Sequence, residues 1–274
     1  MLKITSRENA KLKLARKVRE SREKDLIFVE GLRLAEEVLR SEIGVREIFV
    51  SDEFNKNERA GQLLQAFQSK SHSISEVSGQ LFGSVADTKT SQGIILICEK
   101  PATEKRSFET NFASAKNKLP IVVLLHEINN PSNLGAILRT AEAVDVAGVI
   151  VSKSSADVFS PKSLRASMGA GWRLNIWSDA GFEEVLNWAR EKNLATTAAD
   201  INAEKRYTQI DWNKPRLLIF GSEAHGLSTD EFQKVDEGLI IPMENGVESL
   251  NLAVSCGIIL FEARRQHKNG AQTL

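Results

Sequence analysis

The stretch that decides the fold is residues 240–261, IIPMENGVESLNLAVSCGIILF. It begins with an apolar, strand-like run that Pro242 ends, because proline cannot donate a hydrogen bond within a sheet. A polar loop follows, and Ser249 is the predicted N-cap of an apolar helix that continues to Phe261. A strand end, a loop and a helix N-terminus leave free backbone donors and acceptors in one place. The stretch therefore predicts either an ordinary strand–helix turn or a site for a small polar ligand.

The residues before this stretch alternate between strand and helix patterns. The run 121–125, IVVLL, is typical of a strand buried on both faces. Pro131 and Ser132 then mark the start of a helix whose apolar residues share one side, and Arg139 falls on the opposite side. The alternation indicates an α/β domain. Further strands are expected at 149–151, 174–177, 195–199 and 216–220, with helices after residue 160 and over 182–190.

A glycine-bearing loop, GSEAHGLS at 221–228, follows the last of those strands. Gly221 and Gly226 permit backbone conformations that bring N–H groups close to a ligand. The loop matches neither the dinucleotide fingerprint GxGxxG nor the nucleophile elbow GxSxG. Within it, His225 is interpreted as a loop residue rather than a catalytic base.

The first hundred residues carry a second set of alternating patterns. Strands are expected at 26–29, 45–50, 74–77 and 93–98. Helical spacing places apolar residues on one face in three segments, which contain Leu12 to Val18, residues 30–39 and Leu63 to Phe67. These patterns predict a small α/β domain over residues 1–100 with no catalytic constellation. The polar residues 101–118 are expected to form a linker with room for a short helix, ahead of a second domain over 119–274.

Charge gives a local signal in a chain that is neutral overall. The 274 residues contain 36 basic and 36 acidic side chains, but residues 1–24 contain nine Lys or Arg against three Glu. Such an excess suits contact with RNA phosphates, and it equally suits an ordinary solvated helix face. A basic transit peptide is a third interpretation, against which Glu8 and Glu20 count.

Cysteine usage and hydropathy bear on the compartment. Cys98 and Cys256 lie in separate apolar runs without a CxxC pattern, so no disulfide framework and no metal site is expected. A reducing cytoplasm suits this pattern best. No apolar run approaches the roughly 20 residues of a membrane span, and no secretory signal is evident at the N-terminus. We therefore expect a cytoplasmic protein without a membrane partner.

Three segments together resemble a known family. In order, NNPSNLGAILRTA (129–141), LLIFGSEAHGLS (217–228) and IIPMENGVESLNLAVS (240–255) resemble the three motifs of the SpoU–TrmH family of RNA ribose 2′-O-methyltransferases, in the SPOUT superfamily. PKSLRASMGA (161–170) is similar to the family's intermediate segment, and the likeness extends over 119–267. The N-terminal part resembles the small α/β RNA-binding domain of rRNA-modifying members.

The resemblance implies a fold, a cofactor and partners. It implies a C-terminal trefoil-knotted methyltransferase domain behind the smaller RNA-binding domain, an obligate homodimer, and S-adenosylmethionine held in a bent form. The substrate it implies is RNA, with ribosomal RNA favoured over transfer RNA because of the N-terminal domain. The positions that match the family's cofactor contacts are Gly221, Ile241 and Leu250, and those that match its catalytic and substrate group are Asn133, Arg139, Glu223, Ser249 and Asn251.

Arg139 matches the arginine that is often described as the family's general base. A guanidinium stays charged in proteins, so we expect Arg139 to stabilise the developing alkoxide while facing RNA across the dimer interface. Glu223 is expected to order the loops by accepting hydrogen bonds. The chain departs from the family pattern at the Asn129–Asn130 pair, where many members have an acidic residue, and in the charged loop of residues 246–248.

Two other functions are open to a chain with this sequence. One is an RNA-binding homologue without catalysis, against which the intact Arg139, Glu223 and Asn251 count. The other is an unrelated nucleotide-binding enzyme such as a dehydrogenase. That alternative lacks the glycine fingerprint with an acidic residue about 20 positions further on.

Overall fold

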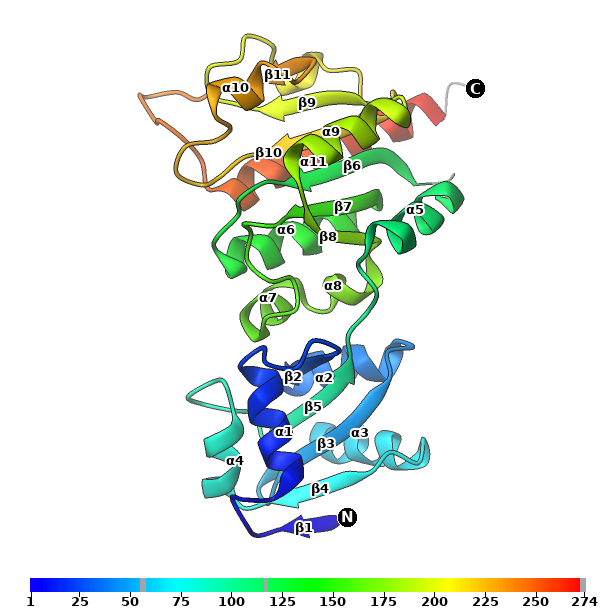
Figure 1. The fold of residues 1–274 in the computed structure, drawn as a ribbon, viewed down its shortest axis with the longest axis vertical. Helices are drawn as coiled ribbons and strands as arrows, with labels where there is room; N and C mark the ends of the chain where they lie inside the picture. Colours follow the sequence, from blue (N-terminus) through cyan, green and yellow to red (C-terminus); the bar gives the residue numbers. More distant parts are fainter. Residues whose placement is uncertain (55–57, 116–117, 272–274) are drawn as a thin grey trace. The chain divides into compact units, whose positions relative to one another are not determined.

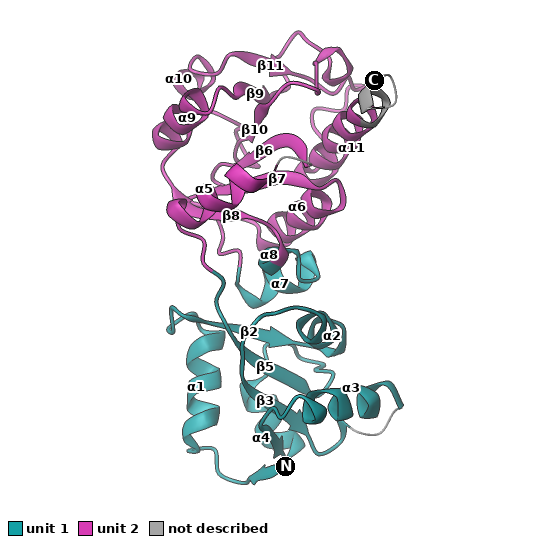
Figure 2. Ribbon diagram, turned by 90° about the vertical axis from the view of Figure 1, so that its right-hand side faces the viewer, with its two compact units in different colours: residues 1–101, 159–172 teal, residues 102–158, 173–274 magenta. Residues whose placement is uncertain are grey.

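The computed structural model describes residues 1–54, 58–115 and 118–271. The chain forms two compact units, which Figure 2 distinguishes by colour. Unit 1 consists of residues 1–101 and 159–172, and unit 2 consists of residues 102–158 and 173–274. A segment from the first part of the second half of the sequence therefore belongs to unit 1 by its contacts. This grouping differs from the sequence-based division, which assigned residues 119–274 to one domain.

Unit 1 is built on a five-stranded sheet in the order β1-β4-β3-β5-β2, in which β5 runs antiparallel to β2 and β3 (Figure 1). Its elements are β1 (Leu2–Ile4), α1 (Ala10–Arg19), β2 (Leu26–Glu30), α2 (Leu32–Arg40), β3 (Val45–Ser51), α3 (Glu58–Ser69), β4 (Ile74–Val77), α4 (Gly79–Val85), β5 (Ile94–Glu99) and α7 (Pro161–Ser167). Helix α8 (Ala170–Arg173) crosses the boundary between the units.

Apolar spacing explains how α1 packs in unit 1. Leu12, Ala15 and Val18 recur every three residues and are buried in the core with Phe28 and Ile95 of the sheet. The helical pattern expected for this segment is confirmed. Strand β1 and helix α4 were not expected, because three residues are too few to show alternation and because α4 contains two glycines.

Unit 2 contains a six-stranded parallel sheet in the order β11-β9-β10-β6-β7-β8. In chain order, the strands and helices of unit 2 are α5 (Lys105–Ser114), β6 (Leu119–Leu125), α6 (Pro131–Ala143), β7 (Val146–Ser152), β8 (Ile176–Ala180), α9 (Phe182–Glu191), β9 (Ala195–Ala199), η2 (Tyr207–Gln209), β10 (Arg216–Phe220), α10 (Thr229–Phe232), β11 (Glu237–Leu239) and α11 (Leu252–Ala271). No helix in the described part of the chain has both the length and the apolar character needed to cross a membrane.

The order of the strands creates a switch point beside β6. From β6 the chain adds β7 and β8 on one side, and it then returns to place β9, β10 and β11 on the other side. In open parallel sheets, ligands bind beyond the carboxyl ends of the strands at such a point. Strands β6 and β10 pair from Ile121↔Arg216 to Leu125↔Phe220, so the loops that follow them leave the sheet together.

The segment expected to be a linker contributes to the core of unit 2. Within residues 101–118, helix α5 places Phe108 fully in the interior, with its ring centroid 5.4 Å from that of Trp188. Phe112 packs against the same indole at 5.2 Å. Two aromatic residues four positions apart lie on the same side of a helix, and this spacing gives α5 an apolar face that a linker does not need.

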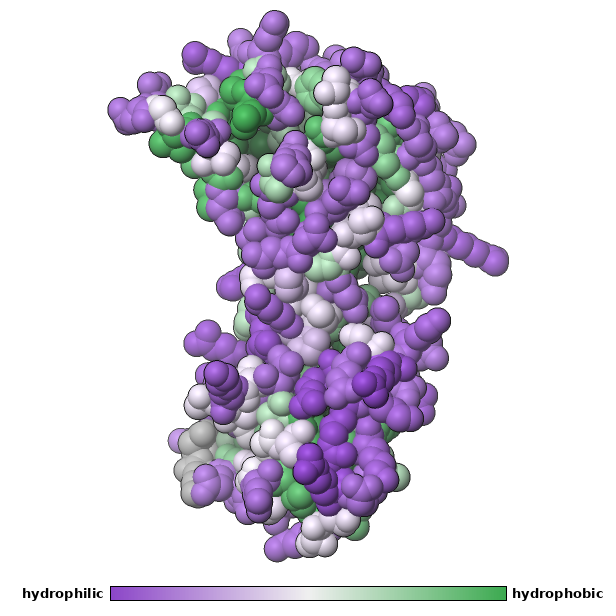
Figure 3. Space-filling view, turned by 60° about the vertical axis from the view of Figure 1, so that its left-hand side comes forward, coloured by the Kyte–Doolittle hydropathy of each residue, from purple (hydrophilic) through white to green (hydrophobic). Residues whose placement is uncertain are grey.

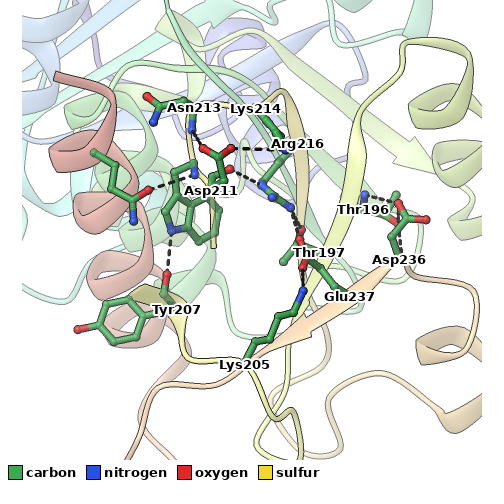
Figure 4. Close-up of polar contacts among 12 residues, drawn as sticks. Thr196, Thr197, Lys205, Tyr207, Asp211, Asn213, Lys214, Arg216, Asp236 and Glu237 are labelled. Atoms are coloured by element: carbon green, nitrogen blue, oxygen red, sulfur yellow. Dashed lines mark hydrogen bonds and ion pairs between the residues drawn. The ribbon is translucent and has the colours of Figure 1, made fainter. Parts of the chain in front are cut away.

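A buried arginine of β10 connects to β9 and β11 through its side chain (Figure 4). Arg216 is 5% exposed, and its guanidinium donates to Thr197 Oγ1 at 2.8 Å and pairs with the Glu237 carboxylate. It also donates to the Asp211 carbonyl oxygen at 2.9 Å. These contacts connect the neighbouring strands β9, β10 and β11.

Candidate active site

A cavity of about 610 Å³ lies in unit 2, beyond the carboxyl ends of β9, β10 and β11. The space-filling view shows a hollow bordered by apolar residues on this unit (Figure 3). Segments from all three sequence motifs line it. The lining consists of Asn133, residues 199–202, residues 220–226, residues 239–241, Met243, residues 248–252, Ser255 and Ile259.

Two glycines shape the turn on one wall of the cavity. A Cβ atom at Gly221 would lie 2.3 Å from the carbonyl carbon of Gly226, so only glycine fits at this position. Ser222 and Gly226 exchange two backbone hydrogen bonds, of 3.0 and 2.9 Å, and Gly226 has a φ of +66°. The loop therefore folds back on itself immediately after β10.

Glu223 connects this loop to the start of α6. Its carboxylate accepts hydrogen bonds from the backbone N–H groups of Asn129 at 3.1 Å and Asn130 at 3.3 Å. It also accepts from Asn133 Nδ2 at 3.1 Å. A negative carboxylate at a helix N-terminus is favourable because the helix dipole is positive there. Glu223 thus orders two loops that are 90 residues apart in sequence.

Asn251 joins the third motif to the first. Asn251 Nδ2 donates to Asn133 Oδ1 at 3.2 Å, and Asn251 Oδ1 accepts from the backbone N–H of Ala253 at 2.9 Å. Asn251 is therefore the residue that caps α11, which begins at Leu252. The prediction that Ser249 is the N-cap was wrong, since Ser249 lies exposed in the loop two residues earlier.

The structure brings seven of the eight sequence-predicted site residues to the cavity. The predicted cofactor contacts Gly221, Ile241 and Leu250 line it, together with Asn133, Glu223, Ser249 and Asn251. Arg139 does not line it. Its side chain is exposed on α6, opposite the buried Leu134 and Ile137, and has no hydrogen-bond or ion-pair partner among the described residues.

Sequence reasoning missed the contribution of the segment after β9. Asp200 and Asn202 line the cavity, and so does His225, which was interpreted only as a loop residue. Asp200 directly follows β9, which pairs with β10. The strand order was the missing information, because it alone places the end of β9 beside the glycine turn.

The lining suits S-adenosylmethionine, which combines an adenosine with a positively charged sulfonium and an amino acid end. The volume of the cavity, about 610 Å³, falls within the range of small-molecule sites. The ionisable side chains in the lining are Asp200, Glu223, Glu248 and His225, with no Lys or Arg among the described lining residues. The Gly221 turn exposes backbone next to apolar Ile240, Ile241 and Leu250, as a flat heterocycle requires. The residues present therefore fit this cofactor.

Comparison with known proteins finds RNA methyltransferases that are similar over most of the chain. The chain is 27% identical to the 23S rRNA (guanosine(2553)-2′-O)-methyltransferase RlmP of Bacillus subtilis, over 96% of this chain and 100% of that protein. The crystal structure of an AdoMet-bound rRNA methyltransferase from Sinorhizobium meliloti is 25% identical, with a TM-score of 0.79 and coverage of 96% and 97%. An RNA 2′-O ribose methyltransferase structure is 27% identical, with a TM-score of 0.79 and coverage of 97% and 100%.

Two family models match separate parts of the sequence. Residues 7–96 match the MRM3-like substrate binding domain. Residues 120–261, which contain every predicted site residue, match the SpoU rRNA Methylase family. The chain therefore belongs to the SpoU rRNA methylase family.

Proposed function

We propose that this protein transfers a methyl group from S-adenosylmethionine to a ribose 2′-hydroxyl of RNA, and that the RNA is ribosomal. The observation that carries the proposal is the cavity lined by all three motif segments, with Glu223, Asn133 and Asn251 joined by hydrogen bonds. The similarity over nearly the whole length of an rRNA 2′-O-methyltransferase supports the same activity.

The bound cofactor supplies a methyl carbon already activated by the positive sulfur, so the protein must position the 2′-oxygen and favour its nucleophilic form. Arg139 is the proposed electrostatic group. Its guanidinium remains charged and has no internal partner among the described residues, so it is available to stabilise the developing alkoxide. The 2′-hydroxyl proton then leaves through water or a phosphate oxygen. Asn133, Ser249 and Asn251 are the proposed positioning groups.

We also propose that the protein acts as a homodimer. The exposed position of Arg139 outside the cavity lining is consistent with a site completed by a second copy. Val254 and Phe261 of α11 are 51% and 57% exposed and lie seven residues apart, so an apolar face is available for burial. We propose in addition that unit 2 contains a trefoil knot and that the protein is cytoplasmic. Sedimentation of the purified chain should give the mass of a dimer. A monomer at micromolar concentration would count against the proposed homodimer.

Unit 1 is the proposed RNA-binding part, because its residues 7–96 match a substrate binding domain. Several cations of the basic N-terminal segment are paired internally. Lys13 Nζ lies 2.6 Å from Glu8 Oε2, and Lys11 Nζ lies 2.7 Å from Glu47 Oε2. Among the described residues, the side chains of Arg7 and Lys24 are exposed and form no hydrogen bond or salt bridge, so these cations are available to phosphates.

The proposed function is tested by mapping 2′-O-methyl groups in total RNA from cells with and without the gene. We expect one ribosomal RNA position to lose its methyl group and to regain it when the gene is restored. Loss of a transfer RNA methyl group instead would favour that alternative substrate. No change at any ribose would favour an RNA-binding protein without catalysis.

A further inference from the structure

Asp200 is a carboxylate in the cavity wall that the predicted site did not include. It directly follows β9, and its backbone N–H donates to the Leu239 carbonyl oxygen at 2.9 Å. Its Oδ1 atom accepts from the backbone N–H of Asn202 at 2.7 Å, which closes a local turn. Both the backbone and the side chain of Asp200 are therefore held in place at the end of the sheet.

The two carboxylate oxygens of Asp200 differ in their contacts. Among the described residues, Oδ2 has no hydrogen-bond partner, and it lies 3.8 Å from the position that a Cβ atom would take at Gly226. Gly226 belongs to the glycine turn that lines the cavity. The anchored side chain thus directs an unneutralised oxygen toward the wall that the proposed cofactor contacts.

The other two carboxylates of the lining are placed differently. Both oxygens of Glu223 accept hydrogen bonds from the start of α6. Glu248 lies exposed in the loop before α11. Asp200 is half-buried and anchored, so its charge is less screened by water than that of Glu248 and less compensated than that of Glu223.

We infer that Asp200 is a specificity-determining residue that favours the positively charged methyl donor over the product of the reaction. The inference rests on the proposed function. S-Adenosylmethionine carries a sulfonium charge, and methyl transfer leaves S-adenosylhomocysteine with a neutral thioether. A fixed negative charge in the cavity wall attracts the donor more than the product, so it promotes exchange of product for fresh donor.

The test measures binding of each ligand separately by titration calorimetry, on the full chain without RNA. The ligands are S-adenosylmethionine, S-adenosylhomocysteine, and an analogue that bears an amino group in place of the methylated sulfur. The variant is Asp200→Asn, whose amide oxygen still accepts from Asn202 N–H. The control is Glu204→Gln, which removes an exposed negative charge four residues away and outside the cavity lining.

We expect Asp200→Asn to lower the ratio of donor affinity to product affinity by about fivefold, and to weaken the charged analogue as much as the donor. Glu204→Gln should leave the ratio unchanged. An unchanged ratio in Asp200→Asn, or equal weakening of donor and product, would overturn the inference. If Asp200→Asn does not fold, Asp200→Ser supplies a neutral hydroxyl that accepts from the same N–H. The ratio of donor affinity to product affinity in that variant then tests the inference. Wild-type protein that binds no donor would instead contradict the proposed function.

Discussion

At the scale of single residues, the site depends on which atoms fit at the turn after β10. Gly221 has no room for a side chain because the Gly226 backbone lies against it. Glu223 and Asn251 then fix the two neighbouring loops through hydrogen bonds to Asn133. The residue identities at these positions could be predicted from the sequence, since each belongs to a motif. The hydrogen bonds could not, because they join segments separated by 90 and 118 residues.

Gly221→Ala should weaken S-adenosylmethionine binding at least tenfold, because the added methyl group would displace the Gly226 backbone that lines the cavity. Titration calorimetry measures the affinity. Gly83→Ala is the matched control, since a Cβ atom there meets nothing within 4 Å. Equal affinity of Gly221→Ala and wild type would show that the turn does not form part of the cofactor site.

Arg139→Ala should lower the rate of methyl transfer by about a hundredfold or more, because one electrostatic group for the developing alkoxide is lost. The affinity for S-adenosylmethionine should stay within about twofold, since Arg139 does not line the cavity. The control is Arg106→Ala, an exposed arginine of α5. Single-turnover kinetics gives the rate, and turnover that survives the Arg139 change would exclude this role.

At the scale of elements, apolar patterning predicted most strands and helices, whereas their ends depended on backbone details. Residues 30–39 were expected to be helical, but α2 begins at Leu32, because Glu30 ends β2 and Gly31 adopts a φ of +107°. Likewise, α11 begins after Asn251 rather than after Ser249. Both residue types are good caps, so the sequence alone did not decide between them. Helix α5 was expected only as a short helix within a linker, because its apolar face consists mainly of Phe108 and Phe112.

The ion pair between β10 and β11 predicts how stability depends on pH. Burial raises the pKa of the Glu237 carboxyl. The hydrogen bonds from Lys205 and Arg216 and the positive charges of these residues lower it by more, so the pKa lies below its ordinary value of 4.5. A depressed pKa means that the folded state favours the ionised form. The resulting stabilisation is present above pH 4.5 and is lost as the pH falls below it.

Glu237→Gln should therefore lower the free energy of unfolding by about 2 kcal/mol at pH 7, because the Arg216 charge loses its partner in a mostly buried position. The difference from wild type should shrink as the pH falls from 5 toward 3. Urea unfolding at each pH measures it, with the exposed Glu191→Gln as control. A difference that is independent of pH would contradict the proposed role of the charge.

At the scale of the whole molecule, the chain combines a matched substrate binding domain with the methylase unit, while its net charge is zero. Composition therefore did not indicate RNA binding, and only the local excess in residues 1–24 did. The division into two α/β units was accessible from the alternating patterns. The assignment of residues 159–172 to unit 1 was not, because contacts between segments distant in sequence determine it.

Replacing Arg7 and Lys24 together by alanine should weaken rRNA binding several-fold and reduce the salt dependence of the affinity, by a slope of about 1.5 for two lost phosphate contacts. Filter binding at several salt concentrations measures both. The control replaces Arg106 and Lys192, two exposed cations of unit 2. Identical salt slopes for the variant and wild type would mean that the basic segment is a solvated face.

The central claim is the transfer of a methyl group to a ribose oxygen, and the most direct measurement follows that group. Purified protein is incubated with methyl-labelled S-adenosylmethionine and unmodified ribosomal RNA, and the RNA is then digested to nucleosides for mass spectrometry. We expect label in a 2′-O-methylnucleoside, and about a hundredfold slower labelling with the Arg139→Ala protein. Label on a base, or no transfer by protein that binds the cofactor and the RNA, would contradict it.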